Sequence, residues 1–285
     1  DFFRNMALEN PSDNYDILWV APLMIKQNIL RNIDEQIDRA RRGEKCGLFF
    51  KTNSITDKEV IDKLVEASQA GVPIDLFVRG ISCILPGVEG YTDRVREVSI
   101  VGQLLEHSRV YGFGPREDCK LYLSSADLMT RNMDKRIEIA WPILNETLRN
   151  QVLGYLGICY SDTAKLRELL PDGSYTALGA FAKRDENGEV ELFDSQKYLI
   201  AEAQRMRLAA AELAARKEAN QGGSAHVVFP LGNVAVEADA GANEVITEEE
   251  SEFVAHRSPE LEAAEAKAVR DAADAMAAAA TATAA

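Results

Sequence analysis

The stretch CGLFFKTNSITDKEVIDKLVEASQAGVPIDLFVRG, residues 46–80, decides the fold. Its two ends, 46–51 and 72–80, are short apolar runs that are typical of buried strands. Between them, Thr56 is the predicted N-cap of a helix, Glu59 follows three residues later, and Gly71 closes the helix. Apolar strands joined by a helix belong in a parallel or mixed sheet that helices cover.

The neighbouring segments continue this alternation. Residues 15–22 form an apolar run that ends at a proline, which predicts a strand, and apolar residues at helical spacing predict a helix over 25–43. Beyond a Gly/Pro-bearing loop at 81–93, a strand-rich part follows, and a helix closes it at 146–160. The further strands are predicted within 95–102, 108–113, 120–126 and 136–143. The predicted class is α/β, with a mixed sheet flanked by helices.

Composition excludes several classes of protein. The chain has 285 residues and a formal net charge of −14, which argues against non-specific binding to duplex DNA or to an anionic membrane. Its four cysteines lie far apart and form no CxxC pair, so they are typical of buried thiols in a reducing compartment rather than of a zinc site. With no apolar run long enough to span a membrane and no signal peptide, we expect a cytoplasmic protein.

The chain changes character near residue 200. A helix is predicted over 194–220 with Asp194 as its cap, and the sequence then becomes loop-like, acidic and finally alanine-rich. Residues 201–285 carry 7 basic and 15 acidic side chains, which account for −8 of the net charge of −14. Low aromatic content and like charge predict a helical or disordered tail over 201–285.

One histidine stands out because histidine is scarce in this chain. Of three histidines, only His107 lies in a dense run of apolar and β-branched residues, LLEHSRVYGF at 104–113. Arg109 follows at strand spacing, so the two side chains are predicted to share a face. If 107–113 and 120–127 pair as a hairpin, Asp127 and the polar residues 130–132 lie near the strand ends, where ligands bind in α/β sheets.

Other strand ends add polar side chains to this edge of the sheet. Arginine forks suit phosphate oxygens, and histidine can attack phosphorus or move a proton, so the predicted chemistry is phosphoryl or phosphodiester transfer. Each residue also has a structural interpretation: a hydrogen-bonded histidine, an arginine in an ion pair, or a Ser/Asp helix cap. The cationic or titratable groups predicted to gather at the strand ends are Lys51, Arg79, His107, Arg109 and Arg131, with Asp127 placed to orient the imidazole.

Three longer motifs carry a family resemblance. These are KTNSITDKEVIDKLVEASQAGVPIDLFVRGISCILPGVEG (51–90), SIVGQLLEHSRVYGF (99–113) and YLSSADLMTRNMDKRIEIAWPI (122–143). Together they closely resemble the C-terminal phospholipase-D-like domain of polyphosphate kinase, of the long type that phosphorylates itself on a histidine. His107 and Arg109 look like an H-x-R variant of the H-x-K pair of that superfamily. The resemblance implies a phospholipase-D-like sheet, with 1–14 ending a preceding domain of this type, 15–200 forming the catalytic domain and 201–285 forming the tail.

The resemblance also implies a reaction and a set of roles. Such enzymes transfer the terminal phosphoryl group of ATP to inorganic polyphosphate, reversibly and with magnesium. Arg79 and His107 match nucleotide-phosphate contacts of the family, with His107 as an assisting catalytic group. The motif positions that imply phosphate binding or support are Lys51, Asn53, Arg109, Asp127, Arg131 and Asn132. The implied partners are ATP, ADP and inorganic polyphosphate in a homo-oligomer, without nucleic acid, and membrane association is left open.

The sequence also departs from the family pattern. The phosphorylated histidine and the magnesium-contacting arginines of the family belong to an upstream domain without a counterpart here, so we expect the isolated chain to be inactive. Leu128 replaces a common tryptophan, and Leu85 stands where an arginine often precedes the proline. Two alternatives therefore stay open beside the kinase: a phospholipase-D-like phosphodiesterase or nuclease, and a non-catalytic module that binds polyphosphate or nucleotide.

Overall fold

The computed structural model describes residues 2–8, 15–184, 188, 190–220, 228–230 and 235–237. These residues divide into two compact units. The first unit holds 2–8, 15–144 and 163–182, and the second holds 145–162 and the described residues between 183 and 237. The predicted tail beyond residue 237 lies outside the described residues.

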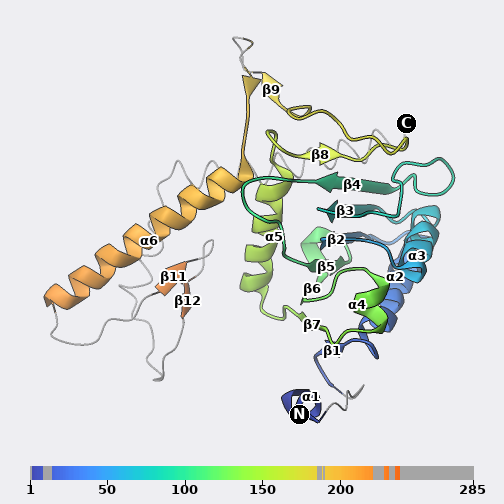
Figure 1. The fold of residues 1–285 in the computed structure, drawn as a ribbon, viewed down its shortest axis with the longest axis horizontal. Helices are drawn as coiled ribbons and strands as arrows, with labels where there is room; N and C mark the ends of the chain where they lie inside the picture. Colours follow the sequence, from blue (N-terminus) through green and yellow to red (C-terminus); the bar gives the residue numbers. More distant parts are fainter. Residues whose placement is uncertain are drawn as a thin grey trace. The chain divides into compact units, whose positions relative to one another are not determined.

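The first unit is built on one eight-stranded mixed sheet. Its strand order is β1-β7-β6-β5-β2-β3-β4-β8, which Figure 1 shows from β8 at the top to β1 at the bottom. Strands β2, β3 and β4 are parallel, whereas β5, β6 and β7 continue the sheet in antiparallel fashion. The strands are β1 (Trp19–Val20), β2 (Leu48–Thr52), β3 (Ile74–Val78), β4 (Val95–Ser99), β5 (Val110–Phe113), β6 (Lys120–Ser124), β7 (Ile139–Pro142) and β8 (Arg167–Glu168).

Two helices bury the apolar face of this sheet. Helix α2 (Ile25–Arg41) presents Ile25, Ile29, Ile33 and Ile37, all at most 1% exposed, to a core that includes Phe50 of β2. Helix α3 (Lys58–Gln69) joins β2 to β3. The predicted helix-covered sheet around 46–80 is therefore confirmed, although β1 is only two residues long within the strand predicted at 15–22.

The start of α3 differs from the prediction by one residue. The N-cap is Asp57, whose carboxylate accepts a hydrogen bond from the backbone N–H of Val60 at 3.2 Å. Thr56 was the wrong cap. The backbone N–H groups of Thr56 and Asp57 both donate to the carbonyl of Leu128, and the second carboxylate oxygen of Asp57 pairs with Lys26 Nζ of α2 at 3.0 Å, which holds this side chain at the start of the helix. Gly71 follows the helix with a φ of 93°, as a C-terminal glycine requires.

The remaining elements are short, except for two helices of the second unit. The predicted cap Asp194 accepts from the backbone N–H of Lys197 at 3.1 Å, and Asp162 accepts from the N–H of Ser195 at 2.8 Å. No helix among the described residues is long and apolar enough to cross a membrane. The elements of the described chain that have not yet been named are α1 (Phe2–Ala7), the 3-10 helix η1 (Arg116–Asp118), α4 (Thr130–Asp134), α5 (Glu146–Tyr160), β9 (Lys183–Arg184), β10 (Val190–Glu191), α6 (Ser195–Asn220), β11 (Val228–Pro230) and β12 (Ala235–Glu237).

Candidate functional site

The site lies at one edge of the sheet, where three strands end and one begins. Strands β2, β3 and β6 run in the same direction, and the segments that follow them stay paired through Ile55, which forms parallel bridges to Ser82 and to Leu128. The backbone N–H of Ile55 donates to the carbonyl of Ile81 at 2.8 Å. Because these segments are tied together, the polar residues that follow the three strands meet at one place.

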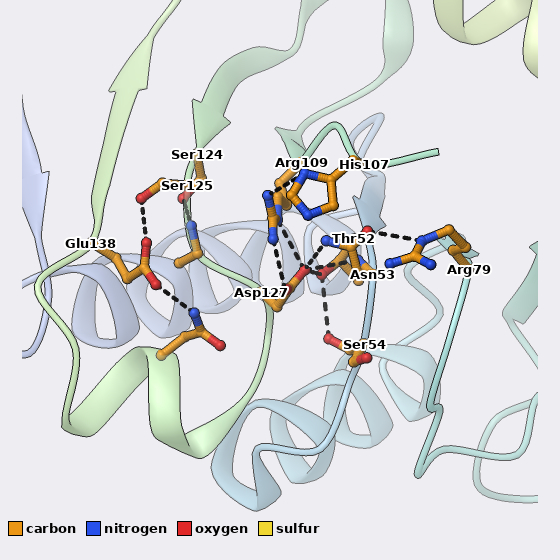
Figure 2. Close-up of polar contacts among 12 residues, drawn as sticks. Thr52, Asn53, Ser54, Arg79, His107, Arg109, Ser124, Ser125, Asp127 and Glu138 are labelled. Atoms are coloured by element: carbon orange, nitrogen blue, oxygen red, sulfur yellow. Dashed lines mark hydrogen bonds and ion pairs between the residues drawn. The ribbon is translucent and has the colours of Figure 1, made fainter. Parts of the chain in front are cut away.

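Asp127 is the centre of this site (Figure 2). Its Oδ1 accepts hydrogen bonds from Thr52 Oγ1 at 3.0 Å, from the backbone N–H of Asn53 at 2.8 Å and from Asn53 Nδ2 at 2.9 Å. Arg109 donates from Nε to Oδ1 at 3.1 Å and from Nη2 to Oδ2 at 3.0 Å. This bidentate pair holds both side chains rigidly, at 15% and 11% exposed.

The electrostatics of Asp127 follow from these contacts. Burial alone would raise the pKa of Asp127, but hydrogen bonds from Arg109 and from the Asn53 backbone, with the positive charge of Arg109, lower it below its usual value. The carboxylate is therefore ionised at neutral pH and serves only as an acceptor. Its negative charge also offsets the positive charge of Arg109.

Asn53 connects Asp127 to a second arginine. While its Nδ2 donates to Asp127, its Oδ1 accepts from Arg79 Nε at 3.1 Å. Arg79 is half-buried, and its Nη1 and Nη2 make no hydrogen bond with the described residues. Gly80 allows this approach, since a Cβ at that position would lie 2.8 Å from the backbone oxygen of Asn53. The arginine fork is thus held by one nitrogen and free at the other two.

His107 lies on the other side of Arg109 (Figure 2). Arg109 Nη1 lies 3.2 Å from His107 Nδ1, and guanidinium nitrogens only donate, so Nδ1 accepts and the imidazole proton lies on Nε2. Both residues precede β5 instead of lying within it, because the strand begins at Val110. The prediction that they lie together is confirmed, and His107 is exposed.

Lys51 does not join this group. It lies inside β2, which extends one residue beyond the predicted end, and its Nζ lies 3.1 Å from Glu106 Oε2. The two side chains are 3% and 7% exposed. The Lys51 ammonium also lies 4.7 Å from the centre of the Phe77 ring. Its charge is consequently satisfied within the protein and removed from solvent.

Two further predicted residues lie on α4, apart from the Asp127 network. Arg131 is exposed, and Asn132 is buried with its Nδ2 donating to Glu138 Oε1 at 2.6 Å. Glu138 Oε2 accepts a hydrogen bond from Ser125 Oγ at 2.5 Å, so this carboxylate connects the segment just before Asp127 to α4 (Figure 2). Glu138 was missed because its partners become visible only when the segment before β7 pairs beside β6.

The site offers no ligand set for magnesium. Among the described residues, no group of three or more His, Cys, Asp or Glu side chains is placed to hold a metal ion. Asp127 accepts five hydrogen bonds, four of them at Oδ1, so its carboxylate is already committed to Thr52, Asn53 and Arg109. The residues of the site therefore do not fit a magnesium ion, and we derive no step through one.

This arrangement of strand-end residues agrees with a comparison to known families. Residues 18–189 match the family model described as polyphosphate kinase C-terminal domain 2. The chain belongs to the polyphosphate kinase family. The predicted α/β class, a mixed sheet flanked by helices, is confirmed.

Individual relatives show how much of a polyphosphate kinase this chain spans. The polyphosphate kinase of Bacillus cereus is 40% identical over 200 residues, which cover 70% of this chain and 28% of the relative. That of Escherichia coli strain K12 is 39% identical over 194 residues, with 67% and 28% covered. The crystal structure of polyphosphate kinase from Porphyromonas gingivalis superposes with a TM-score of 0.61 and 30% identity, covering 70% of this chain and 31% of that one. The chain thus spans less than a third of each.

Proposed function

We propose that this polyphosphate kinase domain supplies phosphate-binding groups for transfer of the terminal phosphoryl group of ATP to inorganic polyphosphate. One observation carries the proposal: Arg79, Asn53, Asp127, Arg109 and His107 form one continuous hydrogen-bonded chain at the strand ends. It ends on one side in the arginine fork of Arg79, which has two nitrogens without a hydrogen bond to any described residue, and on the other in an exposed imidazole. Such planar, paired donors suit phosphate oxygens.

The two arginines have different roles in this proposal. Arg109 is neutralised by Asp127, so it acts as a fixed donor that orients the imidazole. Arg79 is held by the neutral amide of Asn53, so its full charge is available to the phosphates of ATP or polyphosphate. Charge that develops on a transferring phosphoryl group is stabilised by such a preorganised cation.

His107 is proposed to assist the transfer by donating a hydrogen bond from Nε2 to a phosphate oxygen. An imidazole that acts as a nucleophile or base is usually oriented by an acceptor at its other nitrogen. Here Nδ1 faces a guanidinium donor, which withdraws electron density from the ring and makes Nε2 a poorer nucleophile. This geometry favours the assisting role over a covalent one, and it disfavours the phosphodiesterase alternative.

The remaining features of the function are proposed with it. ATP or ADP and inorganic polyphosphate are the proposed substrates, and magnesium is proposed to be held by the upstream domain of the family. The net charge of −14 supports the absence of nucleic acid among the partners. A homo-oligomer and a cytoplasmic location complete the proposal, and light scattering and cell fractionation test them.

The direct test measures binding by calorimetry with the 285-residue chain. Tripolyphosphate and ATP should bind to the wild type, and Arg79→Ala should weaken them about 10- to 100-fold, because a hydrogen bond to a charged group is lost. Arg79→Lys should recover only part, since lysine lacks the fork. Arg31→Ala is the matched control, because Arg31 is also hydrogen-bonded to one asparagine but lies on α2.

A transfer assay then separates the candidate functions. Residues 15–200 should replace the matching part of the Bacillus cereus polyphosphate kinase, and the chimaera should be given labelled ATP and a polyphosphate primer. Chain growth that falls about 100-fold or more in His107→Ala agrees with an assisting hydrogen-bond donor. Cleavage of a phosphodiester without growth would instead identify a phosphodiesterase. Binding by the chain with neither reaction in the chimaera would leave a binding module.

A further inference from the structure

The loop that carries His107 is mostly exposed and has one buried side chain. This loop runs from Ile100, which is fully buried after β4, to Val110 at the start of β5. Residues 101–105 are exposed, and so is His107. Within 101–109, all of which the structure describes, Glu106 is the one buried residue, at 7% exposed. The burial of Glu106 therefore determines where the backbone passes immediately before His107.

Glu106 is held there by Lys51. Lys51 lies on β2, the middle strand of β5-β2-β3, and is paired with Val110 of β5 on one side and with Phe77 of β3 on the other. Its Nζ is fixed between Glu106 Oε2 at 3.1 Å and the Phe77 ring at 4.7 Å. A buried ion pair demands accurate geometry, because two desolvated charges are stable only in close contact. Glu106 consequently has one favourable position, and that position is set by the centre of the sheet.

The contacts of neighbouring residues connect this anchor to the site. Glu106 pairs with Lys51 in the interior, whereas the next residue, His107, contacts Arg109, which is paired with Asp127. Two contacts therefore hold the imidazole in place. Arg109 holds its Nδ1 by a hydrogen bond of 3.2 Å, and the ion pair of Glu106 holds the adjacent backbone.

We infer that Lys51 and Glu106 are positioning residues, whose buried ion pair holds His107 in register with Arg109 and so determines the imidazole tautomer that faces the phosphates. This inference deepens the proposed function and rests on it for the identity of the ligand. It replaces the phosphate-binding role that the sequence predicts for Lys51, because a side chain that is 3% exposed does not reach a ligand in solvent.

The test reads His107 directly, without any enzymatic assay. The full chain, labelled with ¹⁵N in histidine, has three histidines, and the His107→Gln variant assigns the resonances of His107. Above neutral pH, the wild type should show a bare Nδ1 and a protonated Nε2. Glu106→Gln, which keeps the size of the side chain, should give a mixture of both tautomers. The double variant Lys51→Met/Glu106→Leu should do the same while keeping the interior filled.

A control variant and a binding measurement distinguish the positioning role from a purely structural one. Glu117→Gln breaks the exposed pair of Glu117 with Lys45 and should leave the His107 resonances unchanged. Both site variants should also bind tripolyphosphate about tenfold more weakly, as expected when one charge-assisted contact is misaligned. Wild-type His107 resonances in Glu106→Gln would overturn the inference and leave a purely structural ion pair. Changed resonances in a chain whose wild type binds no tripolyphosphate would refute the proposed function and keep the positioning role.

Discussion

Glu97 should make the first unit less stable as the pH rises, and a single substitution should remove this effect. Glu97 lies on β4 and is fully buried. Its Oε2 accepts a hydrogen bond from Ser82 Oγ at 2.7 Å, whereas its Oε1 has no hydrogen-bond partner among the described residues. Burial raises the pKa of Glu97 from 4.5 to about 7, and the hydrogen bond from Ser82 only partly opposes this. The folded protein therefore keeps this carboxyl protonated where the unfolded chain has lost the proton.

The sign and size of this pH dependence follow from the difference between the pKa values of Glu97 in the folded and unfolded states. Below pH 4.5 both states are protonated and Glu97 adds no penalty; above about 7 the folded state carries a buried carboxylate. The difference between 4.5 and about 7 corresponds to about 3.4 kcal/mol, and about 2.5 kcal/mol of it develops between roughly pH 5 and pH 8. Glu97→Gln keeps the size and the hydrogen bond to Ser82 but never ionises. Its stability relative to the wild type should therefore rise by about that amount across this interval.

Tryptophan fluorescence during urea unfolding measures the unfolding free energy of the first compact unit, which contains Glu97. The chain has two tryptophans, Trp19 and Trp141, and both belong to the first unit. Glu89→Gln, at an exposed carboxylate in the loop before β4, is the control and should show no such rise. If the difference in unfolding free energy between Glu97→Gln and the wild type stays constant from pH 5 to pH 8, within about 0.5 kcal/mol, the reasoning about the buried carboxyl is refuted.

Three further substitutions test the network around Asp127. Asp127→Ala should lower the unfolding free energy by about 3–5 kcal/mol at neutral pH, because it leaves the guanidinium of Arg109 buried and unpaired, and urea unfolding measures this. Asn53→Asp should abolish tripolyphosphate binding in calorimetry, since it neutralises Arg79 and sets two carboxylates together; unchanged affinity would contradict the role of Arg79. Gly80→Ala should displace the backbone of Asn53, which the new Cβ would approach to 2.8 Å, and weaken binding about tenfold.

The elements around 46–80 were predictable because their signals are local. Apolar runs, helical spacing and the glycine after α3 each follow from a few neighbouring residues, and the structure agrees with them. The N-cap was assigned to Thr56 instead of Asp57 because both are good caps, and a distant contact, from Lys26 Nζ to Asp57 Oδ2, favours Asp57. Where two local solutions are nearly equal, tertiary hydrogen bonds select between them.

The site was predictable to the extent that strand ends gather at one edge of a sheet. That rule brought together Asn53, Arg79, Arg109, Asp127 and His107, and hydrogen bonds connect all five. It failed for Lys51, because one additional strand residue keeps this lysine inside β2 and turns it to the interior. The role of Glu106 was invisible for the same reason, since an exposed loop with a single buried anchor has no periodic pattern.

Burial also determines how an acidic chain can hold anions. The net charge of −14 repels polyanions at long range, so electrostatic steering does not favour their approach. At physiological ionic strength this repulsion is screened beyond about 8 Å, so the fixed hydrogen-bond donors of the site determine whether an anion binds. The carboxylate of Asp127 neutralises the charge of Arg109 and holds it rigidly in place. The neutral amide of Asn53 holds Arg79 without neutralising it, so the charge of Arg79 remains available to bind phosphate. Phosphate binding here should therefore depend mainly on short-range hydrogen-bond geometry, and the lysine that looked like a ligand contributes by holding that geometry in place.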